Sequence, residues 1–352
     1  MNSVLRLVLV VALVLGHSVS AYAIRITLVA GGEKDAVNIP ATEAKLKEPF
    51  GTAFEGFENM FIIEMVSGNR LLKADRKGVL THVAGTGKPG DGGDGGPALQ
   101  AQFNGPHNLA VLPDGNVLIA DTWNGRVRKV DVKSGKVSTL PGYGVDGKQA
   151  RSNGPYCIAL NSTGTKLYIA DLRRVHMLDL NTGKLKVIAG NGQKGKPQDG
   201  AVATEAPLVD PRAVAVDHGD RVYILERNGN ALRYVNPLGR IRTVVNASGA
   251  KGNTGDDGEA LAATMNGPKH LCVDLDDNVI IADAENHVIR AYMPGTGKMV
   301  RVAGTGKKGN AGVGGDPLQC ELNRPHGVVV HPLTGELYIT DSYNNRVLKI
   351  GK

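Results

Sequence analysis

One sequence unit occurs six times along this chain, and no other feature restricts the fold as strongly. Each unit opens with a proline followed by an apolar run, as in PHNLAV and PHGVVV. The six prolines are Pro49, Pro106, Pro155, Pro211, Pro268 and Pro325, at spacings of 57, 49, 56, 57 and 57 residues. A second apolar run in each unit ends in an acid: Glu64, Asp121, Asp171, Glu226, Asp283 and Asp341. This period indicates a repeat architecture in which neighbouring units bury one another.

Each unit contains short apolar runs separated by turn residues such as Pro113-Asp114-Gly115, which predicts four antiparallel strands per unit. Four-stranded units that repeat radially form a β-propeller, so we predict an all-β, six-bladed propeller over residues 24–352. The sixth unit ends after its third run, and the segment Ile24–Gly32 has the pattern of a fourth. We expect this N-terminal strand to complete the last blade and to offset the entropic cost of closing the ring.

Residues 1–23 have the pattern of a secretory signal peptide. Arg6 precedes an apolar run over residues 7–15, and Ala21-Tyr22-Ala23 is a small-residue cleavage site. The apolar run is too short to span a bilayer comfortably. The sequence therefore predicts a secreted or periplasmic protein with no transmembrane segment after signal cleavage.

Charge and cysteine content set weaker limits. The net charge of +7 is spread along the chain without a block of like charges. It favours anionic partners in general, and we do not expect a nucleic-acid partner. Disulfide-stapled secreted domains are small and rich in cysteine, which this chain is not. We expect its three cysteines to be buried and unpaired, with a single bridge as the alternative: Cys157, Cys272 and Cys320.

The stretch Gly85–Phe103, GTGKPGDGGDGGPALQAQF, begins with a match to the G-x-G-x-x-G dinucleotide fingerprint. That fingerprint requires a helix directly after the glycines, but more glycine follows. A similar stretch recurs at Gly304–Leu322, where Asn310 and Val313 replace Asp91 and Asp94. Because the two copies share glycines and not carboxylates, we predict a connector between blades 1 and 2. A calcium site at the two aspartates is the alternative.

At these residues the chain resembles the NHL-repeat family. The resemblance rests on the opening proline, the apolar run ending in Ala-Asp, the Asn-x-Arg that follows, and the AGTG…GDGGPA connector. Blade 6 is the most similar and blade 2 follows, whereas blade 3 departs most because DLRRVHML lacks the asparagine. The resemblance covers residues 24–352 and implies the propeller fold. It does not decide the function, because NHL propellers include protein-binding platforms, RNA-binding domains, sensor domains and a lyase.

The residue after each proline should lie beside the central channel, because it begins the innermost strand of its blade. These inner-ring residues are Phe50, His107, Tyr156, Arg212, Lys269 and His326. Two cations and two histidines around one channel, with Tyr156 between them, predict a cationic mouth for an anionic ligand such as a carboxylate, a phosphate or a uronic acid. The alternative is that Arg212 and Lys269 extend to solvent or pair with neighbouring acids.

A metal site is a second hypothesis for the same ring. The peptidylglycine amidating lyase of the NHL family, which this chain resembles in this respect, places zinc-binding histidines in Pro-His pairs on alternate blades. The resemblance implies His107 and His326 as zinc ligands, but blade 4 has Arg212 at the third position, and arginine cannot ligate a metal. His270 is a candidate third ligand, although strand alternation should direct it away from the channel.

The six acids and the turns that follow them suggest two further roles. We predict that the acids are structural. Each precedes a turn, and a carboxylate can accept hydrogen bonds from the backbone N–H groups of such a turn. In the turns of blades 2 and 6, Trp123 and Tyr343 occupy equivalent positions, with Arg126 and Arg346 close behind. These residue types anchor protein interfaces, so the turns predict an interaction surface. A buried Trp123 packed between blades is the alternative.

Two functions follow from these patterns. The first is a secreted propeller that recognises a protein partner or a small anionic ligand, and the second is a metal-dependent lyase or hydrolase with a channel site. The chain has no G-x-S-x-G or H-E-x-x-H motif, and its aromatic content of 4% disfavours a carbohydrate-stacking groove. We favour the binding propeller without a resident cofactor, with zinc or calcium as the alternatives.

Overall fold

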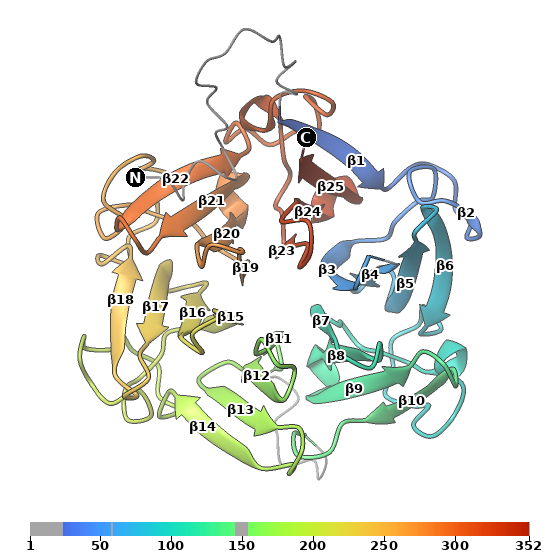
Figure 1. The fold of residues 1–352 in the computed structure, drawn as a ribbon, viewed down its shortest axis with the longest axis horizontal. Coiled ribbons are helices and arrows are strands. Elements are labelled where there is room, and N and C mark those ends of the chain that lie inside the picture. The colour runs from blue at the N-terminus through green and yellow to red at the C-terminus, as the bar shows by residue number, and fades with distance from the viewer. Residues whose placement is uncertain (1–23, 58, 145–153, 352) are drawn as a thin grey trace, which may run out of the picture.

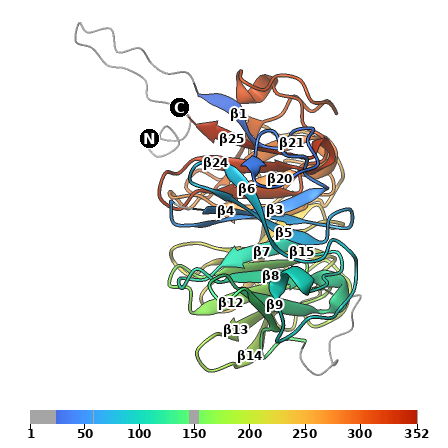
Figure 2. The ribbon, with the colours of Figure 1, turned by 90° about the vertical axis from the view of Figure 1, so that its right-hand side faces the viewer.

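The computed structural model describes residues 24–57, 59–144 and 154–351, which form six antiparallel β-sheets arranged as the blades of a ring (Figure 1). In the edge view, the strands cross the narrow dimension of the ring (Figure 2). The predicted all-β six-bladed propeller is confirmed. The predicted signal segment lies outside the described residues, so secretion stays a prediction. Within the described ranges, no helix is long and apolar enough to cross a membrane.

The strands of each blade follow one another from the channel outward, and blade 1 has an additional short strand at its outer edge. Blades 1 and 2 comprise β2 (Ile39–Pro40), β3 (Pro49–Glu55), β4 (Asn59–Glu64), β5 (Arg70–Asp75) and β6 (Val79–Ala84), then β7 (Asn108–Val111), β8 (Val117–Asp121), β9 (Arg126–Asp131) and β10 (Lys136–Thr139). Blades 3 and 4 comprise β11 (Cys157–Leu160), β12 (Lys166–Ala170), β13 (Val175–Asp179) and β14 (Leu185–Ala189), then β15 (Pro211–Val216), β16 (Val222–Glu226), β17 (Ala231–Val235) and β18 (Ile241–Val245).

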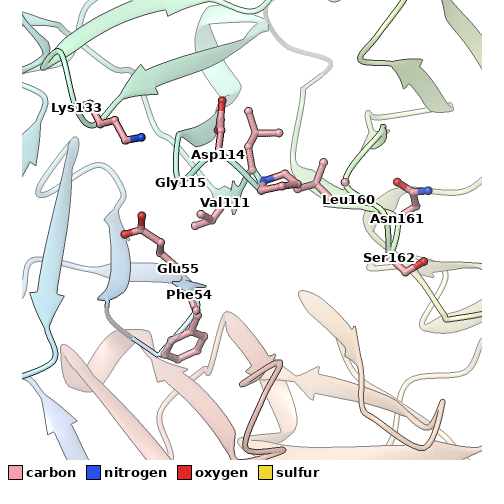
Figure 3. A pocket seen from close by; sticks show the side chains of 13 residues that line it. Phe54, Glu55, Val111, Asp114, Gly115, Lys133, Leu160, Asn161 and Ser162 are labelled. Carbon is pink, nitrogen blue, oxygen red and sulfur yellow. The ribbon is translucent and has the colours of Figure 1, made fainter.

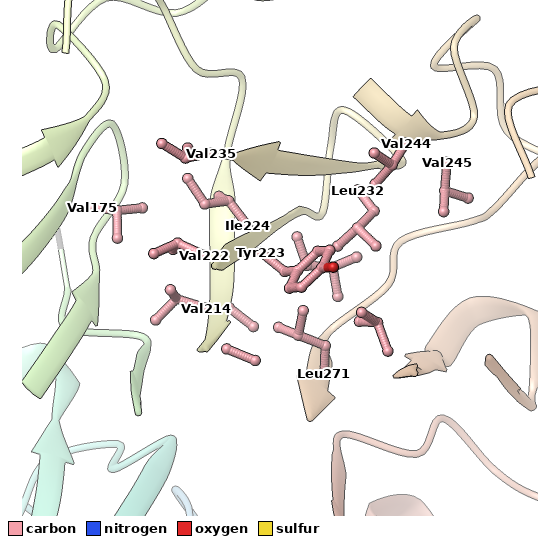
Figure 4. Close-up of a cluster of buried hydrophobic side chains, with 14 of the residues drawn as sticks. Val175, Val214, Val222, Tyr223, Ile224, Leu232, Val235, Val244, Val245 and Leu271 are labelled. Atoms are coloured by element: carbon pink, nitrogen blue, oxygen red, sulfur yellow. The ribbon is translucent and has the colours of Figure 1, made fainter. Parts of the chain in front are cut away.

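Blades 5 and 6 comprise β19 (His270–Val273), β20 (Val279–Asp283), β21 (Val288–Met293) and β22 (Lys298–Ala303), then β23 (Gly327–Val330), β24 (Leu337–Asp341), β25 (Arg346–Gly351) and β1 (Arg25–Ala30). Single 3₁₀ turns occur at η1 (Ala98–Gln100), η2 (Thr122–Asn124), η3 (Ala284–Asn286), η4 (Pro317–Gln319) and η5 (Ser342–Asn344). The apolar strand faces pack between neighbouring blades, and Figure 4 shows this packing around blade 4, where Val214, Ile224 and Leu232 are buried.

The ring is closed as predicted by the N-terminal strand. β1 runs antiparallel to β25, with Arg25 opposite Gly351 and Leu28 opposite Leu348, and the two strands lie side by side in Figure 1. The connector from blade 5 also binds β1, because Gly314 N donates to Ile26 O at 2.7 Å and Ile26 N donates to Gly315 O at 3.0 Å. The last blade therefore joins the two ends of the chain.

Gly85–Phe103 is the predicted connector, and it runs from β6 to β7. On the way it covers the outer strand of blade 2, where Gly95 N donates to Val137 O at 2.8 Å. Such pairing protects an exposed sheet edge. Asp94, one of the two aspartates of the calcium hypothesis, contacts Arg128 at 3.1 Å and accepts from Thr139 Oγ1 at 2.6 Å. A guanidinium group therefore already neutralises this carboxylate.

The six acids are buried at the ends of the second strands, but most of their backbone donors differ from those predicted. Glu226 Oε1 accepts from Val209 N at 2.6 Å, and Asp283 Oδ1 accepts from Asn266 N at 2.9 Å. These donors lie in the connector before the first strand, whereas Asp171 accepts from backbone N–H groups of its own turn, those of Arg173 and Arg174. The second strand of a blade ends beside the point where its first strand begins. An acid there can therefore bind the backbone of the connector that leads into the first strand.

Candidate functional site

All six inner-ring residues predicted from the sequence line one central cavity of about 200 Å³. The start of each innermost strand is fixed by pairing with the end of the second strand. For example, His107 N donates to Ala120 O at 3.2 Å, and His326 N donates to Thr340 O at 3.1 Å. Each of the six blades therefore contributes one side chain to the same point on the axis of the ring.

Aromatic rings line one side of this cavity in an unbroken series, here called the aromatic arc: Tyr343, His326, Phe50, His107 and Tyr156. His326 stacks on Phe50 with ring centroids 4.1 Å apart, and Tyr343 stacks on His326 at 5.7 Å. His107 meets Phe50 and Tyr156 edge to face, at 5.4 and 5.3 Å. The low aromatic content of the chain therefore conceals a local concentration of rings at the channel.

Four cations line the other side and form the cationic arc: Arg212, Arg227, Lys269 and Arg324. The arc joins the rings at both ends, since the Arg212 guanidinium lies 3.8 Å from the centroid of Tyr156 and that of Arg324 lies 4.8 Å from Tyr343. Of these four, the sequence prediction contained only Arg212 and Lys269. Arg227 and Arg324 come from loop positions that have no cationic counterpart in the other blades.

The cations share two carboxylates. Asp210 accepts from Arg227 Nε at 3.2 Å and lies 3.5 Å from Arg212, whereas Glu285 contacts Arg324 at 2.5 Å and Lys269 at 3.4 Å. Arg212 and Lys269 thus pair with acids, as the alternative prediction stated, but each of these acids contacts two cations. Glu48 also lines the cavity, and its carboxylate accepts from Ser67. The cavity therefore retains an excess of positive charge.

Burial makes two of these cations costly to leave without an anion. The Arg212 side chain is 11% exposed, and its buried Nε has no hydrogen-bond partner among the described residues. Burial also lowers the pKa of Lys269 to about 8, and the nearby charge of Arg227 adds to this effect. Both groups would gain from an anionic acceptor inside the cavity.

The two histidines of the predicted mouth are neutral, so its positive charge comes from the arginines and the lysine. His107 Nδ1 donates to Gly105 O at 2.7 Å, and His326 Nδ1 donates to Arg324 O at 2.8 Å. Burial lowers the pKa of His107 to about 3 and holds the pKa of His326 well below its usual value. The charge of Lys269 adds to both shifts, and that of Arg212 adds to the shift of His107. Each ring therefore offers an unprotonated Nε2, which acts as a hydrogen-bond acceptor.

The predicted interaction surface at the turns divides between two places. Tyr343 lines the cavity, and Trp123 is 40% exposed with its ring against Gly105, so the alternative of a buried Trp123 is wrong. Arg346 is buried and donates to Asp341 Oδ2 at 2.8 Å, and Arg126 contacts Asp121 at 3.5 Å. The acids thus engage both arginines, and the two aromatic residues remain the exposed members of this surface.

A second hollow lies on the opposite face of the ring, where the turns between the first and second strands of blades 1 to 3 meet (Figure 3). It measures about 430 Å³, and its charged residues Glu55, Asp114 and Lys133 are of both signs. Asn116 Nδ2 donates to Asp114 at 2.8 Å, and Asn59 Nδ2 donates to Glu55 at 2.5 Å. Because these carboxylates already have partners, the central cavity is the stronger candidate site.

Comparison with known proteins identifies the repeat. The sequence profile of the NHL repeat matches residues 103–130 and 322–350, which lie over the first three strands of blades 2 and 6, the two copies most similar to the family from sequence alone. The chain carries NHL repeats. Over 323 residues it is 23% identical to the human NHL repeat-containing protein 2, and the match covers 81% of this chain and 44% of that protein. The NHL-repeat propeller thus spans less than half the length of this curated relative.

Solved structures share the fold of the NHL-repeat propeller at low sequence identity. An auxiliary nutrient binding protein from Bacteroides ovatus superposes with a TM-score of 0.69 and 15% identity, over 94% of this chain and 77% of that chain. Virginiamycin B lyase from Staphylococcus aureus superposes with a TM-score of 0.52 and 12% identity, over 91% of this chain and 82% of that chain. At these identities the likeness shows the fold alone.

The residues of the central cavity test the hypothesis of a zinc site at His107 and His326. His107 and His326 each donate Nδ1–H to a backbone carbonyl, as metal-ligating histidines do. Within the described ranges, however, no three His, Cys, Asp or Glu side chains converge as a metal would require. Arg212 occupies the third position. His270 does line the cavity, contrary to prediction, but its Nε2 lies 2.9 Å from Asn108 Nδ2. The residues present do not fit a three-ligand zinc site.

Proposed function

We propose that the NHL-repeat propeller binds a small anionic ligand in its central cavity, and that the ligand combines a carboxylate with a flat apolar face. The observation that carries this proposal is the pairing of a cationic arc with an aromatic arc around one cavity. An anion alone would need only the cations, and an apolar ligand only the rings. Uronic acids and aromatic carboxylates have both features.

The contacts available in the cavity define how such a ligand would bind. Its carboxylate would accept from the guanidinium group of Arg212 and the ammonium group of Lys269, each of which shares its carboxylate partner with a second cation. Its apolar face would stack on Phe50 and Tyr156. Hydroxyl groups would donate to the free Nε2 atoms of His107 and His326. The nutrient-binding protein that shares the fold supports a binding role.

Arg212→Met tests the proposal directly. The change removes the guanidinium group and keeps an unbranched stem beside Tyr156, so we expect the affinity for D-galacturonate or benzoate to fall tenfold or more, because charged hydrogen bonds contribute about 1.5–3 kcal/mol. Arg242→Met is the matched control, because Arg242 lies in the same blade as Arg212 and also stacks on a tyrosine, 4.9 Å from Tyr234, but lies outside the cavity. Isothermal titration calorimetry measures both affinities.

Two results would contradict the proposed function. One is the absence of millimolar or tighter binding for galacturonate, benzoate and inorganic phosphate to the unmodified protein. The other is equal binding by the Arg212→Met and Arg242→Met variants. Galactose is the neutral comparison for galacturonate, and we expect it to bind more weakly because it lacks the carboxylate.

The pH dependence of galacturonate affinity is a separate expectation. Lys269 is protonated below its pKa of about 8, so the affinity should be highest below that pH and fall as the pH rises through it. It should not increase between about pH 7 and 5.5, because the pKa of His107 is about 3 and both ring histidines stay neutral there. Titrations across this range should show one alkaline decline, which Lys269→Gln removes. A gain in affinity on acidification would show that the histidines titrate, contrary to their placement.

A further inference from the structure

A groove leads from the central cavity toward the outside of the ring over blades 4 and 5, and we call it the side groove. It measures about 460 Å³ and shares Arg227, Lys269 and Arg324 with the central cavity. Lys251 lies at its exposed side, and Glu285 is the one carboxylate among its lining residues. The two hollows therefore form one continuous positively charged surface.

The central cavity alone is small for a ligand site. Pockets that hold small molecules usually begin at about 300 Å³, and the central cavity measures about 200 Å³. A ligand that fills it can extend only where the wall is open, and the residues shared with the side groove mark that opening.

The lining of the side groove differs from that of the central cavity. Amide side chains of Asn228 and Asn266 accompany the cations, and none of its lining residues is aromatic. Cations and amides bind carboxylates and hydroxyl groups, whereas the aromatic arc suits the flat face of a single ring. The side groove therefore fits a hydroxylated, charged continuation of the ligand.

Arg324 stands between the two hollows in a left-handed conformation, which is the usual conformation at its repeat position. Its φ is +49°, and the equivalent positions in blades 2 and 5 are glycines, Gly105 with φ +55° and Gly267 with φ +56°, whereas blade 1 has Glu48 with φ +54°, which also lines the central cavity. A left-handed conformation is unfavourable for a branched or long side chain and natural for glycine. Strain of this kind at a cavity points to a role of the side chain in the site.

We propose that the ligand is an acidic oligosaccharide, with one charged sugar unit in the central cavity and the next charged unit in the side groove. This inference rests on the proposed function and names its ligand class. The first carboxylate binds Arg212 and Lys269, and Arg324 lies between the two units. The second acidic group binds Arg227 and Lys251. The amide groups of Asn228 and Asn266 exchange hydrogen bonds with the hydroxyl groups of the second unit.

The test compares D-galacturonate with digalacturonate by isothermal titration calorimetry of the full chain. We expect digalacturonate to bind at least tenfold more tightly, and we expect cellobiose, the neutral disaccharide, to bind more weakly than either. Lys251→Gln should remove most of the gain from the second unit and leave the galacturonate affinity unchanged, because Lys251 lines only the side groove. Lys133→Gln, on the opposite face, should change neither affinity.

Arg324→Gly provides a second test that does not depend on Lys251. Glycine relieves the positive φ, so this variant should unfold at a denaturant concentration no lower than the unmodified protein, while its digalacturonate affinity falls tenfold or more. Loss of stability without loss of affinity would show that Arg324 is structural and would overturn its place in the site. A disulfated disaccharide in place of digalacturonate shows whether sulfate esters serve as well as carboxylates.

The outcomes separate this inference from the proposed function. If galacturonate binds and digalacturonate binds no more tightly, the side groove does not take a second unit and the inference is wrong, while the proposed function stands. If galacturonate, benzoate and phosphate all fail to bind, the proposed function fails and the inference fails with it. A gain for digalacturonate that survives in the Lys251→Gln variant would place the second unit elsewhere.

Discussion

Glu226→Gln is expected to lower the free energy of unfolding by about 3–5 kcal/mol, which is the usual cost of removing one partner of a buried ion pair. Glu226 is fully buried, and its Oε2 accepts from Arg233 Nε and Nη2, both at 2.7 Å. Glutamine has the same shape but turns either an N–H group or a weaker acceptor toward a guanidinium group that is 1% exposed. The positive charge would remain in the protein interior without a counter-charge.

Urea unfolding monitored by circular dichroism measures this effect. Glu43→Gln is the matched control, because Glu43 also pairs with a cation, at 2.6 Å from Lys34, but both side chains are largely exposed. Surface pairs contribute at most about 1 kcal/mol, so the control should unfold close to the unmodified protein. Equal unfolding midpoints for the two variants would show that the buried acids do not stabilise the blades.

The fold could be predicted because the same constraints repeat in every blade. The proline that begins each inner strand and the acid that ends the second strand, such as Pro211 and Glu226, mark the register of the two strands independently of the intervening turn. Ring closure was predictable for a related reason. The sixth unit lacks a fourth strand, and the N-terminal segment has the pattern of that strand. The donors of the buried acids were not predictable, because Val209 and Glu226 are separated in sequence and meet only after the strands pair.

The site was predictable only where it follows the repeat. The inner-ring residues share one repeat position, so their convergence on the cavity follows from the six-fold architecture. Arg227 and Arg324 occupy different positions, one after the acid of blade 4 and one before the proline of blade 6, and only the closed ring brings them together. The sequence signal was present, since each is a cation where the other blades lack one.

The charge state of the histidines and the use of the aromatic residues depend on tertiary contacts. Nothing in the Pro-His pair shows that Nδ1 of His107 donates to a carbonyl two residues earlier, or that burial lowers its pKa. An overall aromatic content of 4% also says nothing about where the rings lie. Because blades 6, 1, 2 and 3 are consecutive around the ring, one ring from each of blades 1, 2 and 3 and two from blade 6 were enough to build the aromatic arc.

Ile26→Asp is expected to destabilise the propeller by about 4–5 kcal/mol, because it places a carboxylate without a partner in an apolar core. Ile26 is fully buried in β1, within a cluster that includes Ile339 and Leu348 of the last blade. Ile26 lies opposite Ile350 of β25 on one side, and on the other its backbone forms hydrogen bonds with Gly314 and Gly315. A charge there would weaken both attachments of the strand that joins the chain ends.

Thr27→Asp is the control for this prediction, because it adds the same charge to the same strand. Thr27 is half-buried and lies opposite Lys349, which pairs with Glu336 at 2.8 Å, so a carboxylate there shares an oppositely charged neighbour, and we expect a change below about 1 kcal/mol. Urea unfolding measures both variants. If Ile26→Asp unfolds at the same urea concentration as Thr27→Asp, β1 contributes little to stability, and the remaining contacts between blades 6 and 1 must hold the ring closed.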